Sequence, residues 1–208
     1  MTSPDTPRRD HGGLRPPWST LILAGLALVL YALFGARPET LIFTRDGIQA
    51  GELWRLFTGH LVHTGAGHLV WNLLALLVLG SMYEVLERPS PRRYFAIFAA
   101  GCLAIDAALW WGQPGLLGYC GLSGVLTATF VLAVVAGWRA TGSPWVLLGG
   151  AGVLAKIGFE MATGQTLFAD TAWPPVPLAH VAGLLAGLAF VLPIRPWDPT
   201  ADLRREAS

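Results

Sequence analysis

Long apolar segments recur along this chain, each bounded by proline, glycine or charged residues. A helix of about 20 residues spans the roughly 30 Å hydrocarbon core of a bilayer. Only helices and closed barrels satisfy their backbone polar groups there, and runs of 18 to 20 apolar residues suit helices. The sequence therefore predicts an all-α membrane protein with six transmembrane helices. The predicted spans are Trp18–Ala36, Gly67–Leu86, Tyr94–Trp111, Gly121–Trp138, Pro144–Met161 and Pro177–Ile194.

The composition agrees with a chain that faces lipid. Hydrophobic residues make up 53% of the 208 residues and charged residues only 13%, and the mean hydropathy is +0.52. Soluble domains carry about 25% charged residues. The formal net charge of +1 gives no electrostatic case for nucleic acid. Cys102 and Cys120 fit neither a disulfide framework nor a zinc site, and we expect no metal or organic cofactor.

The basic residues predict how the chain is oriented. Cytoplasmic loops of membrane proteins carry an excess of Lys and Arg. With six spans, one side of the membrane holds Arg8, Arg9, Arg15, Arg88, Arg92, Arg93, Arg139, Arg195, Arg204 and Arg205. The other side holds three, Arg37, Arg45 and Arg55, all in the long first connection. Both termini are thus predicted to be cytoplasmic.

The chain is expected to have three parts. Residues 1–17 form a polar tail expected to be disordered and cytoplasmic, residues 18–194 the membrane domain, and residues 195–208 a cytoplasmic tail. The first apolar run is longer than that of a cleavable signal peptide, so we expect it to remain as a helix. In the first connection, Gly51–His60 mixes aromatic and charged residues, as is typical of a segment at the headgroup level.

Polar side chains within the spans are the best functional candidates, because the bilayer disfavours them. His68 and Asn72 lie four residues apart and share a helix face. Ser123 opens the fourth span and His180 the sixth, and the predicted topology puts all four residues at one depth, near the outer surface. Singly, each could be an ordinary packing residue; together they are complementary.

These side chains supply the groups needed for acyl transfer. A serine hydroxyl becomes a nucleophile when a base takes its proton, and imidazole can do so near neutral pH. Ser123 and His180 would form a dyad, since no Asp or Glu lies in the sixth span or at the matching depth of the second. His68, Asn72 and the backbone N–H of Ser123 are candidate donors to an oxyanion.

Glycines predict which helices meet. His180, Gly183 and Gly187 lie on one stripe of the sixth span, and such Gly-x-x-x-Gly spacing lets a neighbouring helix approach closely. If that neighbour is the fourth span, with Gly121 and Gly124 beside the serine, the histidine is brought against it.

These motifs resemble the rhomboid family of intramembrane serine proteases over about Gly51 to Ile194. The shared features are Trp54-Arg55, His63-x₄-His68-x₃-Asn72, Gly121-Leu-Ser-Gly124 and Ala179-His180-x-x-Gly183-x₃-Gly187. The resemblance implies a six-helix bundle with Ser123 as nucleophile, His180 as general base, and His68 and Asn72 in the oxyanion site. It also implies a structural or water-retaining His63 at the cavity mouth, although a plain loop histidine is an open alternative.

A narrower resemblance is to the rhombosortases, small rhomboids that cleave C-terminal sorting tails from exported bacterial proteins. Such a tail holds Gly-Gly, an apolar segment and basic residues. The resemblance rests on Tyr119-x-Gly-Leu-Ser-Gly-Val-Leu126 and on Lys156-x₃-Glu160. Lys156 and Glu160 either neutralise each other in the membrane or contact substrate. Thr127 departs from the family, where many members carry an aromatic residue that stacks on the histidine; packing or hydroxyl bonding must replace it.

We therefore expect a multi-pass protein of the bacterial inner membrane whose site opens to the periplasmic side. Its expected partners are the bilayer and the transmembrane segment or C-terminal tail of an exported protein. The alternatives are a general rhomboid protease and a non-catalytic rhomboid-like protein that binds membrane clients. A small transporter is disfavoured because the chain has no internal repeat.

Overall fold

The computed structural model describes residues 15–165, 173 and 175–191. In this part of the chain, all regular structure is helical, apart from one isolated bridge between Phe43 and Tyr119. The helices are α1 (Trp18–Phe34), α2 (Arg45–Gln49), α3 (Arg55–Leu61), α4 (Ala66–Glu87), α5 (Pro91–Gly112), α6 (Ser123–Thr141), α7 (Pro144–Thr163) and α8 (Pro177–Val191).

The long helices follow the predicted apolar segments closely. Among the described residues, α4, α5, α6 and α7 are long and apolar enough to cross a membrane. Helices α1, with 17 residues, and α8, with 15, are apolar but shorter. The all-helical architecture is as predicted, and four spans are supported by length and composition. Most of the expected N-terminal tail and the last residues of the chain lie outside the described residues.

Local sequence explains where the helices stop and start. Ser90 caps α5 by accepting a hydrogen bond from the backbone N–H of Arg93, and Pro91 takes the first helical position. Gly142 and Gly164 adopt left-handed backbone angles after α6 and α7, with φ of 60° and 68°. Ser90 and Gly142 lie in the short α4–α5 and α6–α7 connections, whereas Gly164 begins the longer connection between α7 and α8.

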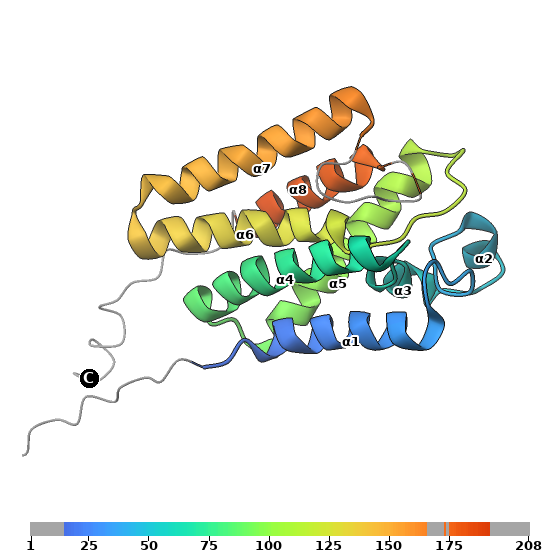
Figure 1. Cartoon of the computed structure of the whole chain (residues 1–208), viewed down its shortest axis with the longest axis horizontal. Helices are drawn as coiled ribbons and strands as arrows, with labels where there is room; N and C mark the ends of the chain where they lie inside the picture. The colour runs from blue at the N-terminus through green and yellow to red at the C-terminus, as the bar shows by residue number, and fades with distance from the viewer. Residues whose placement is uncertain (1–14, 166–172, 174, 192–208) are drawn as a thin grey trace, which may run out of the picture.

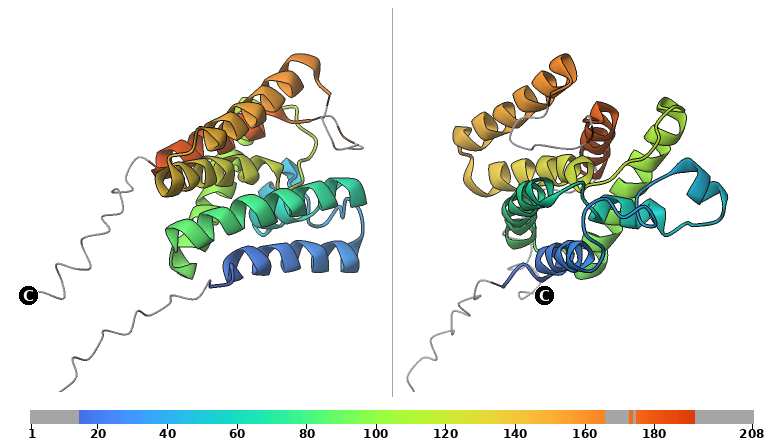
Figure 2. Two further views of the ribbon diagram at one scale, coloured as in Figure 1. Left: turned by 60° about the vertical axis from the view of Figure 1, so that its left-hand side comes forward. Right: turned by 45° about the vertical axis from the view of Figure 1, so that its right-hand side comes forward.

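Helix α6 is the centre of the bundle (Figure 1). It packs most extensively against α8 and α4, while α7 has its main contacts with α6 and α8. Figure 2 shows α1 and α7 on opposite sides of α6. Cys102 and Cys120 are both buried and free.

Glycines allow α6 and α8 to approach closely, as the sequence predicted. A Cβ atom at Gly183 would collide with the carbonyl oxygen of Gly124. A Cβ atom at Gly187 would lie 2.8 Å from the carbonyl oxygen of Ala128. Such contacts with backbone atoms cannot be relieved by rotating a side chain, so both glycines are required for this packing.

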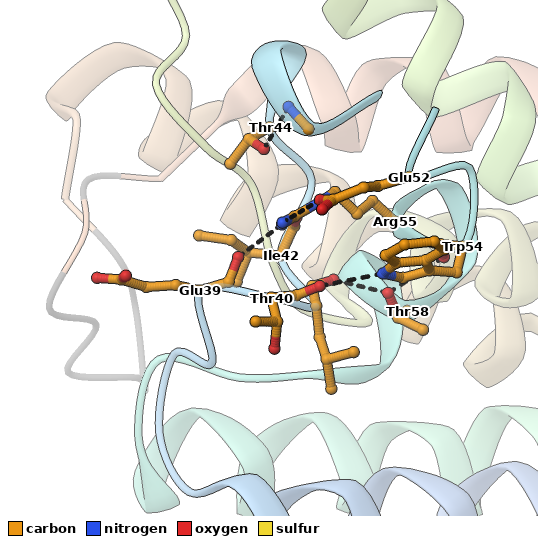
Figure 3. Close-up of polar contacts among 10 residues, drawn as sticks. Glu39, Thr40, Ile42, Thr44, Glu52, Trp54, Arg55 and Thr58 are labelled. Atoms are coloured by element: carbon orange, nitrogen blue, oxygen red, sulfur yellow. Dashed lines mark hydrogen bonds and ion pairs between the residues drawn. The ribbon is translucent and has the colours of Figure 1, made fainter. Parts of the chain in front are cut away.

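The first connection is held together by Arg55 (Figure 3). Its guanidinium donates to the carbonyl oxygens of Glu39 at 2.6 Å and Ile42 at 2.8 Å, and to Glu52 Oε2 at 2.5 Å. Trp54 Nε1 donates to the carbonyl of Thr40 at 3.1 Å. The planar fork of arginine thus fixes the loop that contains α2 and α3. The sequence did not predict these two helices.

Arginine also ties this connection to the bundle. Arg45 donates to the carbonyls of Leu109, Trp110 and Gln113 at the end of α5, and its guanidinium lies over the Trp110 ring. A cation at this end of a helix interacts favourably with the terminal carbonyl groups and the helix dipole. Further along, His60 of α3 and Asp106 of α5 form a buried pair with a 3.1 Å separation.

The N-terminus of α1 is capped by a residue of α4. Glu84 accepts hydrogen bonds from the backbone N–H groups of Ser19 and Thr20, each at 2.9 Å, and from the Thr20 hydroxyl. The Thr20 hydroxyl also lies 3.0 Å from the hydroxyl of Tyr94 on α5. A carboxylate at a helix N-terminus is stabilised by the exposed N–H groups there. This contact fastens α1 to the bundle.

Candidate active site

The N-terminal ends of three helices meet around one cavity. The cavity has a volume of about 260 Å³ and is lined by His68 and Asn72 of α4, Ser123 and Thr127 of α6, and His180 of α8. Lys156 and Glu160 of α7 also line it. The polar residues singled out in three separate spans are thus brought together.

Ser123 and His180 lie within hydrogen-bond distance. The Oγ of Ser123 is 3.1 Å from Nε2 of His180. The histidine is buried and the serine is half-buried. Ser123 is the first residue of α6, so its backbone N–H belongs to the helix terminus, where N–H groups lack intrahelical partners. This is the geometry that a serine nucleophile and its base require.

The backbone before the serine is held in a conformation that favours glycine. Gly121 has a φ of 120°, and a Cβ atom there would lie 2.6 Å from Cε1 of His68 and 3.6 Å from Nδ2 of Asn72. Its N–H donates to the carbonyl of Gly59 at 2.9 Å. Gly121 therefore lets the chain pass directly over His68 and Asn72.

Two candidate oxyanion donors, Asn72 and His68, line the cavity together with the serine. The Asn72 amide nitrogen is buried and makes no hydrogen bond to any residue that the structure describes. His68 Nδ1 lies 3.0 Å from the hydroxyl of Thr64, and the opposite edge of its ring faces Gly121. Thr64 was not predicted as part of the site, although its position one turn before His68 was a usable signal.

His63 packs against His68 and does not line the cavity. It has 0% exposure and is absent from the cavity wall, and its ring stands edge-on to that of His68 with centroids 5.0 Å apart. Burial, and to a smaller extent the charge of His68, lowers the pKa of His63 to about 3. His63 is fully buried and packs against His68, as a structural residue would, and its role stays a prediction.

The family of this chain follows from a comparison with known proteins. The model of the Rhomboid domain matches residues 50–197, which is more than half of the chain. The chain belongs to the rhomboid family. This membership and the apolar helices indicate an integral membrane protein.

Curated relatives of this rhomboid include one protein whose name describes a protease and one whose name describes an inactive protein. Rhomboid-related protein 2 of Mus musculus is 30% identical over 203 residues, covering 87% of this chain and 65% of the relative. Putative rhomboid protease YdcA of Bacillus subtilis is 26% identical, covering 55% and 59% respectively. Inactive rhomboid-related protein 2 of Caenorhabditis elegans is 27% identical, covering 67% and 40%. The matches thus span less than two thirds of each of these relatives.

In this rhomboid chain, a carboxylate lies near the ring nitrogen of His180 that does not face Ser123. Glu160 Oε2 lies 3.9 Å from Nδ1 of His180, and Oε1 accepts a hydrogen bond from Lys156 at 2.6 Å. Glu160 is 2% exposed. Glu160 was expected to pair with Lys156 or to contact substrate, and its proximity to His180 was not predicted, because a carboxylate was expected only from the second or sixth span and Glu160 comes from the fifth.

Thr127 acts on the backbone of the histidine and not on its ring. Its hydroxyl lies 2.6 Å from the carbonyl oxygen of Gly124 and 2.9 Å from that of His180. Packing and hydroxyl bonding were the two expected substitutes for an aromatic residue. The hydroxyl fixes the position of α8 at His180, one turn of α6 beyond the serine.

Proposed function

We propose that this rhomboid is an intramembrane serine endopeptidase that hydrolyses a peptide bond of a membrane-anchored protein near the outer face of the membrane. The observation that carries the proposal is the 3.1 Å separation of Ser123 Oγ and His180 Nε2 inside a cavity with polar groups. Nucleophile and base within this distance are the minimum for covalent acyl transfer.

The residues around the cavity account for each step. Ser123 Oγ attacks the carbonyl carbon of the scissile bond while His180 Nε2 takes the hydroxyl proton. The negative charge that develops on the carbonyl oxygen is stabilised by Asn72, His68 and the backbone N–H of Ser123. The C–N bond then breaks, and His180 gives its proton to the leaving amine. Water, activated by the same histidine, hydrolyses the acyl-enzyme ester and restores Ser123.

For the substrate, we propose a C-terminal sorting tail with Gly-Gly, an apolar segment and basic residues. The rhombosortase-like motif around Ser123 supports this class, as does the presence of Lys156 and Glu160 on the cavity wall. A general rhomboid protease that cleaves other single-pass proteins is the alternative. The arginine distribution supports cytoplasmic termini and a site that opens to the opposite side, which in the proposed bacterial inner membrane is the periplasmic side.

A non-catalytic client-binding rhomboid is a second candidate, because one relative carries the name inactive. The presence of Ser123 and His180 at hydrogen-bond distance favours catalysis over that candidate.

Labelling with a serine-directed fluorophosphonate probe in membranes tests the proposal. We expect wild type and the control Ser143→Ala to be labelled and Ser123→Ala to be unlabelled. Ser143 is a matched control because its side chain makes no capping hydrogen bond and it lies at the opposite end of α6 from Ser123. Labelling that persists in Ser123→Ala, or folded wild-type protein that resists the probe, would contradict the protease proposal.

A second experiment separates the two substrate classes. Two membrane-anchored reporters share one extracellular domain, and only one of them ends in Gly-Gly, an apolar segment and a basic tail. Cleavage of this reporter alone would support the sorting-tail substrate. Equal cleavage of both would leave the general rhomboid protease as the function.

A further inference from the structure

We propose that Glu160 is a positioning residue for His180, so that the site works as Ser123–His180–Glu160 with Lys156 as the partner of the carboxylate. This inference rests on the proposed serine-protease function and extends it. It assigns a role in the reaction to Glu160 and Lys156, which have none in a mechanism that uses the Ser123–His180 dyad alone.

The two nitrogens of the His180 ring face different helices. Nε2 lies 3.1 Å from Ser123 on α6, and Nδ1 lies 3.9 Å from Glu160 Oε2 on α7. In a serine-protease triad, the carboxylate lies on the side of the ring that faces away from the serine. The order of groups around His180 is therefore that of a triad, although the acid comes from a neighbouring helix.

A simple neutralising ion pair does not account for the position of Glu160. Oε1 contacts Lys156 Nζ at 2.6 Å, which satisfies the pairing of the two opposite charges. Glu160 nevertheless lies deep in the cavity wall, with 2% exposure, whereas the Lys156 side chain is 34% exposed. An ion pair alone is better solvated near the cavity opening, since burying a carboxylate costs free energy. The buried position places the second oxygen against the histidine.

The carboxylate has two effects on the ring. It favours the tautomer with the hydrogen on Nδ1, which leaves the Nε2 lone pair free to take the serine proton. It also stabilises the imidazolium that forms when that proton arrives. At 3.9 Å the interaction is a charge contact rather than a hydrogen bond, and such contacts often shorten when substrate binds.

Other groups near His180 disfavour a positive charge on its ring, and the carboxylate must offset their effect. Lys156 of α7 and His68 of α4 both face the same cavity and oppose a positive charge on the ring. Asp106 is on α5, which also packs on α8, but its carboxylate is paired with His60. Glu160 is thus the carboxylate placed to balance the imidazolium.

The test compares Glu160→Gln with the double variant Lys156→Met/Glu160→Gln, in which no lysine is left without its partner. We expect the fluorophosphonate labelling rate and kcat to fall roughly 10- to 100-fold in both, with KM for the reporter unchanged. This loss is below the ~10⁴-fold cost of altering the hydrogen-bonded acid of a serine-protease triad, because Glu160 is not in direct hydrogen-bond contact. Glu160→Asp should recover part of the rate.

The pH profile distinguishes positioning from a structural role. Without the carboxylate, the imidazolium is less stable, so the acidic limb of the kcat/KM profile should move to lower pH in Glu160→Gln, and by less in the double variant, which also loses the opposing charge of Lys156. Loss of a packing contact would lower the rate without moving this limb. Glu87→Gln, which breaks the Arg139–Glu87 pair of 3.5 Å away from the cavity, is the control and should leave rate and profile unchanged.

Each outcome has a defined meaning. A folded double variant with the wild-type rate and the wild-type pH profile would overturn the role of Glu160 and leave the Ser123–His180 protease intact. A rate loss with an unmoved acidic limb would also overturn it. Absence of labelling in wild type would instead contradict the protease function itself.

Discussion

The hydroxyl of Thr127 lies 2.9 Å from the backbone carbonyl oxygen of His180, so one side chain of α6 fixes the position of α8 along α6 at the candidate base. The same hydroxyl lies 2.6 Å from the carbonyl oxygen of Gly124, one turn earlier on α6. The Thr127 hydroxyl therefore holds the backbone of His180 close to the first turns of α6, where Ser123 lies.

Replacing Thr127 by valine should therefore lower the labelling rate of Ser123 while the protein stays folded. Thr127→Val keeps the shape but removes the hydroxyl, at a net cost of about 1 kcal/mol in stability. We expect a labelling rate about tenfold lower, because a small displacement of His180 weakens its contact with the serine. Thr127→Ser, which keeps the hydroxyl, should retain the rate; equal losses in both variants would contradict this explanation.

Gly183→Ala should disrupt the α6–α8 contact. The added methyl group meets the carbonyl oxygen of Gly124 and the hydroxyl of Thr127, so the helices must separate. We expect a loss of about 1–3 kcal/mol or more and no labelling of Ser123. Gly152→Ala on α7 is the matched control, since nothing lies within 4 Å of its Cβ position. The thermal midpoint in detergent measures both, and an unaffected Gly183→Ala variant would refute the close packing.

Asn72→Ala should reduce cleavage without abolishing it. Removing one oxyanion donor typically costs ~10²–10³-fold in kcat, and His68 and the Ser123 N–H would remain. His180→Ala, which removes the base, should abolish cleavage. Reporter cleavage measures both rates, and the thermal midpoint shows that each variant folds. Full activity of His180→Ala would refute the assignment of the base.

Glu84→Gln should loosen α1. The amide keeps one acceptor oxygen where the carboxylate has two, and it lacks the charge that interacts favourably with a helix N-terminus, so we expect a loss of about 0.5–2 kcal/mol. Glu87→Gln on the same helix serves as the comparison, because Glu87 does not cap α1. Thermal unfolding measures the difference. Labelling of Ser123 should persist in both, since neither residue lines the cavity.

Acid should destabilise the protein through His63. Its pKa is lowered by burial from 6.5 to about 3, with His68 as the nearest like charge and the Leu61 backbone as an opposing hydrogen-bond partner. The folded state therefore binds fewer protons than the unfolded chain between these pH values. The contribution of neutral His63 to the free energy of unfolding is therefore fully present above about pH 6.5. It is lost as the pH drops toward 3, by an amount on the order of a few kcal/mol.

His63→Phe tests this pH dependence, because phenylalanine fills the buried position but does not titrate. The unfolding free energy should fall less steeply on acidification than in wild type. If both proteins lose stability equally between pH 6.5 and 5, roughly where the unfolded histidine gains its proton, His63 is not the responsible group.

Apolar length and helix terminators made most of the bundle predictable. Pro144 begins the fifth predicted span and α7, and Trp18 begins the first span and α1. Glycine spacing also predicted the α6–α8 contact. These features are local, so the sequence displays them directly.

Long-range side-chain contacts were not predictable in the same way. Helices α2 and α3 depend on Arg45 and Arg55, most of whose acceptors are carbonyl oxygens that any residue could supply. Lys156 and Glu160 are visible as a pair of opposite charges one turn apart. That Glu160 faces His180 depends on the rotation of α7 about its axis, which one helix sequence does not determine.

The cap that Glu84 places on α1 has a consequence for biogenesis. The bonded partners Ser19 and Glu84 are separated by 65 positions in the chain. When the first apolar segment leaves the ribosome, its leading N–H groups have no carboxylate to meet, and α4 must be synthesised before they are satisfied. The first helix therefore reaches its final seat only after the second long helix has been inserted, which makes their association a late step in assembly.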